Sequence, residues 1–281
     1  MAEIVAIHAV SHTPVMINFP GAIPDDDRER IFASFREVGE QIVNAKPDVV
    51  VVISDDHIHN FFLNNFPAVC IGAAESYDTP AEHWLKLDRQ TLKGDARLGG
   101  YLLEQALNSG FDPSFSMELR LDHGTLAPMH LAGVAQDFAI VPLLVNCVQP
   151  PLPLMKRALE WGVFLGKALR AYDGCERVAI LATGGISHDI ATPRMGMVNE
   201  IFDREFMRLL GAGNDDELVR YAADHVNEAG NGAEEIRTWL MAHGAAAGGR
   251  YETLYYKAVS NWYTGIGLGR WEASKAEGKA A

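Results

Sequence analysis

Two kinds of hydrophobic pattern alternate along the chain. Short runs rich in valine, isoleucine and other apolar residues are followed by longer segments in which apolar residues recur every three or four positions. This alternation is typical of strands that are crossed over by helices in a mainly parallel sheet. It predicts strands at 3–9, 48–54, 68–72, 114–121, 139–146 and 177–183. The apolar run from Val49 to Ile53 is uninterrupted, which predicts a central strand with both faces covered.

The helical segments would cover that sheet. Asp26 is suited to cap a helix that extends to about residue 45, with an inward-facing stripe formed by Ile31, Phe32, Phe35, Val38 and Ile42. Further helices are predicted at 95–109, 154–171, 194–210, 216–226 and 233–246. A chain of 281 residues suits one large α/β domain with a mainly parallel or mixed central sheet flanked by helices. We assign this domain to residues 1–272 and a flexible C-terminal tail to the small and polar residues 273–281.

Charge and cysteine content exclude several classes of function. A formal net charge of −13 would repel the phosphate backbone of nucleic acid. Gly265, Gly267 and Gly269 follow no helix-opening pattern, so we expect no nucleotide cofactor. The cysteines at positions 70, 147 and 175 form no CxxC pair, which favours free thiols in a reducing compartment. The sequence shows neither a signal-peptide pattern nor an apolar run of about 20 residues, so we expect a cytoplasmic protein without membrane contact.

Four of the ten histidines share one topological property. His12, His57, His123 and His188 each lie at or just past the carboxyl end of a predicted strand. Ligands bind at that edge of an open α/β sheet, so we expect the four imidazoles to converge. A single histidine in such a place is more often structural than functional, but four at one edge favour a metal or acid–base site.

Acidic residues precede two of these histidines. Asp56 lies next to His57, and Asp122 lies next to His123. Either carboxylate could accept a hydrogen bond from an imidazole and fix which ring nitrogen faces a metal. Aspartate is equally common as a turn-stabilising residue, so both interpretations stay open at this level.

The motifs around these histidines, in this order, resemble a known family. This is the class III (type II) extradiol ring-cleaving dioxygenases, typified by the large β subunit of protocatechuate 4,5-dioxygenase. The resemblance covers nearly the whole chain, and each motif alone is weak. It rests on Ser11-His12-Thr13-Pro14, Asp56-His57, Leu121-Asp122-His123-Gly124 with Pro128, Gly184-Gly185-Ile186-Ser187-His188 with Pro193-Arg194, Glu235-Ile236-Arg237-Thr238-Trp239 and Ser260-Asn261.

The resemblance implies an Fe(II) cofactor bound by two histidines and one carboxylate. The implied ligands are His12, His57 and Glu235, and such a set leaves positions open for a diol and O2. Glu234 is the rival carboxylate. The family motif places its glutamate four residues before a tryptophan, here Trp239, which favours Glu235.

The resemblance also implies roles for residues that do not bind the metal. His188 matches the family's acid–base residue, which exchanges protons with the substrate. His123 matches a second catalytic histidine, close to the substrate and O2. Ser260 and Asn261 match a substrate-binding segment near the substrate carboxylate in protocatechuate-type members.

The implied activity is the O2-dependent opening of a vicinal-diol aromatic ring beside its hydroxyls. Protocatechuate, gallate and 3-O-methylgallate are the leading substrates, followed by dihydroxypyridines and catechols with a longer side chain. We expect a homo-oligomer, which acts alone or with a separate small subunit. A zinc hydrolase that uses the same two-His, one-Glu site is the alternative function. A non-catalytic protein with this fold would be expected to have lost one of these residues, and none is missing.

Overall fold

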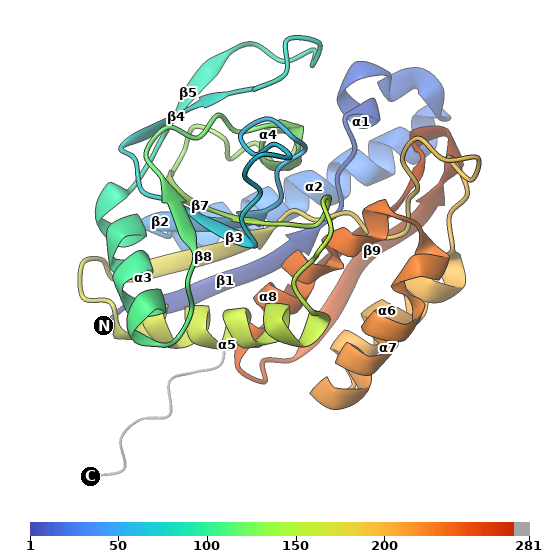
Figure 1. Ribbon diagram of the computed structural model, residues 1–281. Coiled ribbons are helices and arrows are strands. Elements are labelled where there is room, and N and C mark those ends of the chain that lie inside the picture. Colours follow the sequence, from blue (N-terminus) through green and yellow to red (C-terminus); the bar gives the residue numbers. More distant parts are fainter. Residues whose placement is uncertain (273–281) are drawn as a thin grey trace.

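An eight-stranded mixed sheet forms the centre of the computed structural model, which describes residues 1–272 (Figure 1). The strand order is β6-β3-β7-β2-β8-β1-β10-β9. The four central strands are parallel, and they are β1 (Glu3–Val10), β2 (Val49–Ser54), β7 (Ala139–Val145) and β8 (Arg177–Ala182). On one side β3 (Val69–Gly72) pairs antiparallel with β7 and parallel with β6 (Ser114–Ser116). On the other side β10 (Thr264–Trp271) and β9 (Tyr251–Val259) add an antiparallel pair.

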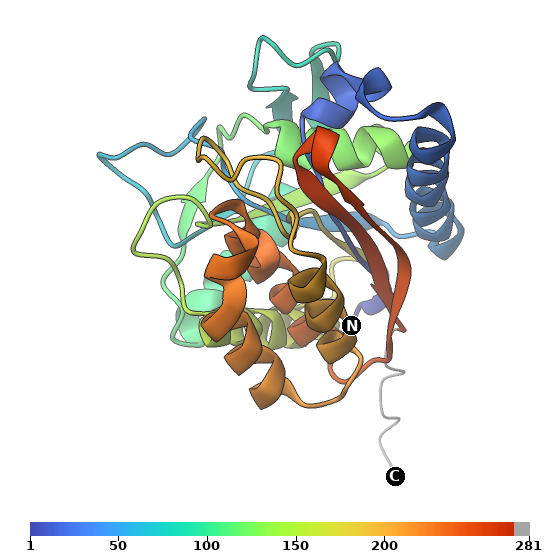
Figure 2. The same cartoon turned by 90° about the vertical axis from the view of Figure 1, so that its right-hand side faces the viewer.

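Helices cover both faces of this sheet, as the alternation of patterns predicts (Figures 1 and 2). Val49, Val51 and Ile53 of β2 face one apolar core, and Val50 and Val52 face the other. The first core is shared with α3 (Ala96–Asn108), α5 (Met155–Ala171), α6 (Glu200–Leu210), α7 (Asp215–Ala229) and α8 (Ile236–Ala246). The second core is shared with α2 (Asp25–Ala45) and α4 (His123–Ala132). The expected fold class, one α/β domain with a mixed sheet between helices, is confirmed.

Strands were harder to predict where their residues lack β-branched runs. The segment predicted at 114–121 is a strand only over β6, and β4 (Ser76–Thr79), β5 (Gln90–Lys93), β9 and β10 were not predicted. β10 carries Gly265, Gly267 and Gly269 along one face, which lowers its strand propensity. A side chain at these glycines would collide with groups such as Ile186, Asp203 or Tyr251. Close packing against the first core therefore explains the glycines, which form no nucleotide loop.

Helix boundaries also differ in places from the sequence-based prediction. Asp26 lies in the first turn of α2 and caps nothing, because the helix begins at Asp25 after Pro24. The helix predicted at 194–210 begins only at Glu200, where Asn199 caps α6. The prediction at 233–246 corresponds to a 3-10 turn, η2 (Gly232–Glu235), followed by α8. α4 was missed because it contains Gly124 and Pro128, both poor helix formers.

Three neighbouring parallel strands bring their carboxyl ends to one edge of the sheet. β8 lies between β2 and β1, in register with both. His12 follows β1, His57 follows β2 and His188 follows β8. The fold therefore gathers three of the four predicted histidines at the edge where open α/β sheets bind their ligands.

Other predictions concern the thiols, the membrane and the tail. Cys70 and Cys147 are buried free thiols, and Cys175 is a partly buried one. No helix within residues 1–272 is long and apolar enough to cross a membrane. The tail predicted at 273–281 lies outside the described residues.

Candidate active site

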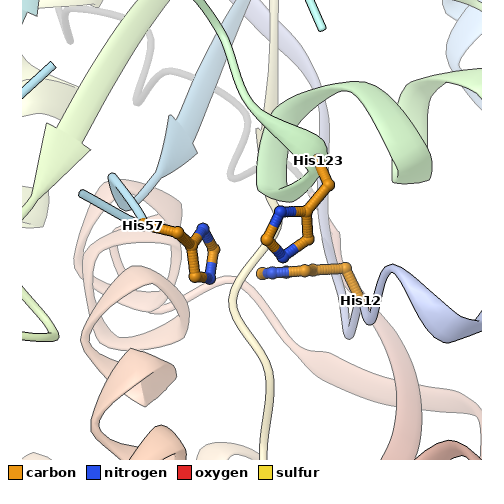
Figure 3. Close-up of side chains that lie close together, drawn as sticks. All are labelled: His12, His57 and His123. Carbon is orange, nitrogen blue, oxygen red and sulfur yellow. The ribbon is translucent and has the colours of Figure 1, made fainter. Parts of the chain in front are cut away.

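Three imidazoles converge at the carboxyl edge of the sheet (Figure 3). The ring centroid of His12 lies 5.2 Å from that of His57 and 5.3 Å from that of His123. The His57 and His123 centroids are 4.1 Å apart. His12 and His123 are buried, and His57 is partly buried. The predicted convergence of these residues, which are far apart in the sequence, is therefore present.

His123 reaches this cluster by a route that differs from the predicted one. β6 runs antiparallel to the central strands, so its carboxyl end lies at the opposite edge of the sheet. The chain returns across the sheet after Ser116, and His123 is the first residue of α4. Asp122 caps this helix by accepting a hydrogen bond from the Gly124 N–H. His123 is thus positioned by the start of a helix and not by the end of a strand.

Asp122 fixes the orientation of His57, although it precedes His123 in the sequence. Its Oδ2 accepts hydrogen bonds from the His57 backbone N–H at 2.8 Å and from Nδ1 at 3.0 Å. Burial opposes a charge on Asp122, but the His57 ring holds the pKa of this carboxyl well below its usual range. Nδ1 of His57 is therefore occupied, and Nε2 is left to face the centre of the site.

His12 is oriented in a similar way by a backbone carbonyl. Its Nδ1 donates to the carbonyl oxygen of Thr183, just past the end of β8. Because a carbonyl only accepts, Nδ1 carries the proton and Nε2 has a free lone pair. Burial lowers the pKa of His12 to about 4, against the opposing influence of Glu235. The imidazole is therefore neutral at neutral pH, as a metal ligand must be.

Glu235 is the carboxylate that faces these imidazoles. It is buried where η2 passes into α8, with Oε1 3.6 Å from Nε2 of His57 and Oε2 3.7 Å from Nδ1 of His12. Oε2 also accepts a hydrogen bond from the Gly185 N–H. Burial would raise the pKa of Glu235, but His12 and His188 hold it well below its usual value.

Glu234, the rival carboxylate, points elsewhere. It forms an ion pair with Arg237 on the same helical segment. Arg237 is further held by the carbonyl oxygen of Pro153. Trp239, the other marker of the motif, donates from Nε1 to the Gly184 carbonyl at 2.7 Å. It thereby fastens α8 to the loop that leads to His188.

The donor set fits a divalent cation. Ligand atoms of His12, Asp55, His57 and Glu235 all lie within 4.8 Å of one another, and so do those of His12, His57 and His123. Asp55 is 1% exposed, and its two oxygens accept no hydrogen bond from any residue of the described chain. Burial and the neighbouring Glu235 raise the pKa of Asp55 well above its usual value. A buried carboxylate without donors that lies beside a second carboxylate is stabilised by a cation between the two.

His188 lies beside this group without belonging to it. Its Nδ1 donates to the Ile186 carbonyl at 2.7 Å, and its Nε2 lies 3.2 Å from Oε1 of Glu235. Burial opposes protonation, but Glu235 raises the pKa of His188 above its usual value. Among residues 1–272, no group of side chains with metal-binding geometry includes His188. This arrangement suits a proton-exchanging residue better than a ligand.

Three side chains near the site, Glu82, Trp84 and Asp55, are not indicated by the sequence patterns. Glu82 accepts hydrogen bonds from both the backbone N–H and Nδ1 of His123, and it also lies 3.4 Å from Nε2 of His59. The ring of Trp84 lies 5.9 Å from that of His123. Both residues sit in the segment between β4 and β5, whose hairpin has no strong sequence pattern. For Asp55, the acidic pair Asp55-Asp56 before His57 is the one signal in the sequence.

Asp56 stabilises a turn and orients no imidazole. Its carboxylate accepts hydrogen bonds from the backbone N–H groups of His59, Asn60 and Phe61. Within this turn Ile58 adopts a φ of 62°, a conformation that β-branched residues rarely take and that is typical of functional loops. For this aspartate, turn stabilisation is the correct interpretation.

Ser260 and Asn261 lie in a 3-10 turn, η3 (Ser260–Trp262), beside the segment that continues from His12. Asn261 donates to the Ala22 carbonyl, and Trp262 donates to that of Phe19. The described hydrogen bonds and ion pairs do not join Ser260 or Asn261 to the histidines. Their role in substrate binding stays a prediction.

A cleft of about 250 Å³ opens directly onto the site. Apolar side chains form much of its wall, and three of them, Ile58, Val148 and Ile190, are substantially exposed. A larger cavity of about 680 Å³ lies between α3 and α5 and contains none of the site residues. The smaller cleft is therefore the relevant one, with space for a single aromatic ring.

Comparison with known proteins decides the family. The family model described as the catalytic LigB subunit of aromatic ring-opening dioxygenase matches residues 6–267. The chain belongs to this family. It is thus an extradiol ring-cleaving dioxygenase, and the zinc hydrolase alternative loses its support.

Individual members of the LigB family extend the comparison. A 2,3-dihydroxyphenylpropionate/2,3-dihydroxicinnamic acid 1,2-dioxygenase of Photorhabdus laumondii is 27% identical, over 94% of this chain and 96% of the relative. An enzyme of the same name from Mycobacterium sp. (strain MCS) is 28% identical, over 95% and 98%. The fold of this chain is similar to that of an uncharacterized protein, JW3007, of Escherichia coli K12, with a TM-score of 0.64 and 15% sequence identity. That structure is matched over 95% of this chain and 100% of its own.

Proposed function

We propose that this dioxygenase uses Fe(II), bound by His12, His57 and Glu235, to open a vicinal-diol ring with O2. The observation that supports the proposal most strongly is that ligand atoms of His12, His57 and Glu235 lie within 4.8 Å of one another, with Oε1 of Glu235 3.6 Å from the free Nε2 of His57. Fe(II) in this site would supply a Lewis acid for the paired hydroxyls and a redox centre through which electrons of the diol reach O2.

His188 is proposed to act as the acid–base residue. Its Nδ1 is held by the Ile186 carbonyl, so only Nε2 is available for proton exchange. Nε2 faces the carboxylate of Glu235, so it lies where a hydroxyl of a substrate in the site would need to lose a proton. The same nitrogen could later return that proton to a reacting oxygen.

His123 is proposed to complete the wall of the site on the side of α4. Glu82 holds its Nδ1, which directs Nε2 toward the other imidazoles. Burial and the neighbouring His57 lower the pKa of His123, so the ring is neutral and can accept a hydrogen bond from a substrate hydroxyl. We assign it a catalytic role in orienting the diol.

The substrate is proposed to be a single aromatic ring with neighbouring hydroxyls. The size of the cleft and its apolar wall suit one ring. Relatives of this chain are named for 2,3-dihydroxyphenylpropionate. This catechol with a longer side chain, which the sequence placed in the second group of substrates, therefore becomes a leading candidate. Protocatechuate, gallate, 3-O-methylgallate and a dihydroxypyridine complete the set to be tested.

Metal binding by neighbouring glutamate variants tests the ligand assignment. We expect Glu235→Ala to lose most bound Fe(II) and activity after anaerobic reconstitution, because the site loses a carboxylate ligand and its negative charge. Glu234→Ala is the matched control and should keep its iron, since Glu234 pairs with Arg237. Iron content, O2 uptake and melting temperature would be measured together. Full iron occupancy in a folded Glu235→Ala protein would disprove the assignment.

A further inference from the structure

Asp55 is a buried carboxylate that is held by no hydrogen bond from the described residues. It follows β2 directly and is 1% exposed. Neither of its oxygens accepts a hydrogen bond from the described residues. A buried carboxylate normally has donors or a cation beside it, because desolvation without compensation is costly. A protonated His57 ring, 3.4 Å away and without a hydrogen bond to Asp55, is the positive charge that the described residues offer this carboxylate.

The carboxylate of Asp55 points to the same place as the proposed iron ligands. Its Oδ2 lies 3.4 Å from Nε2 of His57, and that nitrogen lies 3.6 Å from Oε1 of Glu235. Ligands at about 2.0–2.2 Å from a shared ion are about 3.0–3.5 Å apart in octahedral or tetrahedral geometry. The observed separations are close to this range.

A hydrogen bond to His57 does not explain the position of Asp55. Nδ1 of His57 already donates to Asp122. If Nε2 binds the metal, it carries no proton, and Asp55 cannot accept a hydrogen bond from it. The remaining interaction open to the Asp55 oxygens is with the cation itself.

We propose that Asp55 is a fourth protein ligand of the metal in the substrate-free enzyme. The proposal rests on the proposed function in that the site must hold a divalent cation. Two carboxylates and two neutral imidazoles would balance the charge of that cation. In an octahedral ion, four protein ligands leave two positions, so Asp55 would leave the ion when a diol and O2 bind to it together.

The neighbouring aspartates differ from Asp55 in this respect. Asp56 is saturated by backbone N–H groups of its own turn. Asp122 is saturated by His57 and Gly124. Of the three aspartates, only Asp55 has both oxygens unpaired and turned toward the proposed ligands.

Cobalt(II) binding to aspartate variants tests the inference, because the visible spectrum of Co(II) reports its coordination. We expect Asp55→Ala and Asp55→Asn to weaken Co(II) affinity by about 100-fold or more, beyond the tenfold to hundredfold typical of residues that only support a ligand. Their spectra at saturating Co(II) should differ from that of the wild type. The melting temperature of each variant without metal would be measured to show that it is folded.

Two control variants separate a ligand from a supporting or a merely buried residue. Asp122→Asn should weaken affinity but keep the wild-type spectrum. Asp203→Asn should change neither, since Asp203 is equally buried but bonded to Ser187 and Tyr256. A wild-type Co(II) spectrum in Asp55→Ala or Asp55→Asn would overturn this inference but not the proposed function. Failure of the wild type to bind Co(II) or Fe(II) would overturn the proposed function as well.

Discussion

At the scale of single residues, the site is organised by which ring nitrogen each histidine leaves free. Nδ1 is hydrogen-bonded to a backbone carbonyl in His12 and His188. In His57 and His123 it is hydrogen-bonded to a carboxylate. Each Nε2 is thereby left for a metal, a substrate or a proton. The partners that achieve this lie far away in the sequence, so the choice of nitrogen could not be predicted from motifs.

The role of His188 can be tested by removing its imidazole. We expect His188→Ala to retain Fe(II), because the residue belongs to no group with metal-binding geometry in the described chain. Turnover should fall on the order of a hundredfold or more, the scale typical of positioned proton transfer. Iron content and melting temperature, compared with turnover at saturating O2, check both parts. Near-normal turnover in a folded, iron-loaded variant would rule out the acid–base role.

At the scale of elements, parallel strands explain how much of the site the sequence could predict. His12, His57 and His188 follow strands with clear apolar runs, and these strands are adjacent in the sheet. The positions of Glu235 and His123 are set by the starts of helices, and that of Glu82 is set by the segment between β4 and β5. Helix starts and hairpins are placed by tertiary packing, so only the resemblance to a family indicated Glu235. The strand pattern pointed to His123, but the strand ends at Ser116 and does not position it.

The glycines near His188 show how closely these elements approach. A Cβ at Gly232 in η2 would lie 2.0 Å from Nε2 of His188, and one at Gly185 would lie 2.6 Å from its Cε1. Neither glycine has a positive φ, so backbone conformation alone does not require glycine at these positions. Space for the imidazole is what these positions require.

Gly232→Ala should therefore damage catalysis more than folding. The new methyl group would push the His188 ring away from Glu235, and we expect a loss of turnover similar to that of His188→Ala with iron retained. Gly100→Ala, on the exposed face of α3 with open space around it, is the matched control. It should raise stability by roughly 0.5–1 kcal/mol and leave turnover unchanged. Equal turnover in Gly232→Ala and wild type would show that the position of the ring does not matter.

At the scale of the whole molecule, the fold explains why a strongly acidic protein can hold this site. The net charge of −13 favours attraction of a metal cation and disfavours anionic polymers. Two apolar cores fix the sheet from both faces, so the ends of β1, β2 and β8 form a rigid base for the ligands. The fold class and the edge that carries the site could be predicted from hydrophobic pattern and charge. The substrate could not, because the exposed side chains around the cleft follow no such pattern.

Product analysis tests the central claim most directly. The Fe(II)-loaded enzyme would be given O2 labelled with the heavy oxygen isotope and each candidate diol, beginning with 2,3-dihydroxyphenylpropionate and protocatechuate. We predict that O2 is consumed and that the ring opens beside the two hydroxyl-bearing carbons, with both labelled atoms in the product. The Zn(II)-loaded protein should be inactive. Cleavage between the hydroxyl-bearing carbons, or product formation without O2 uptake, would contradict the account.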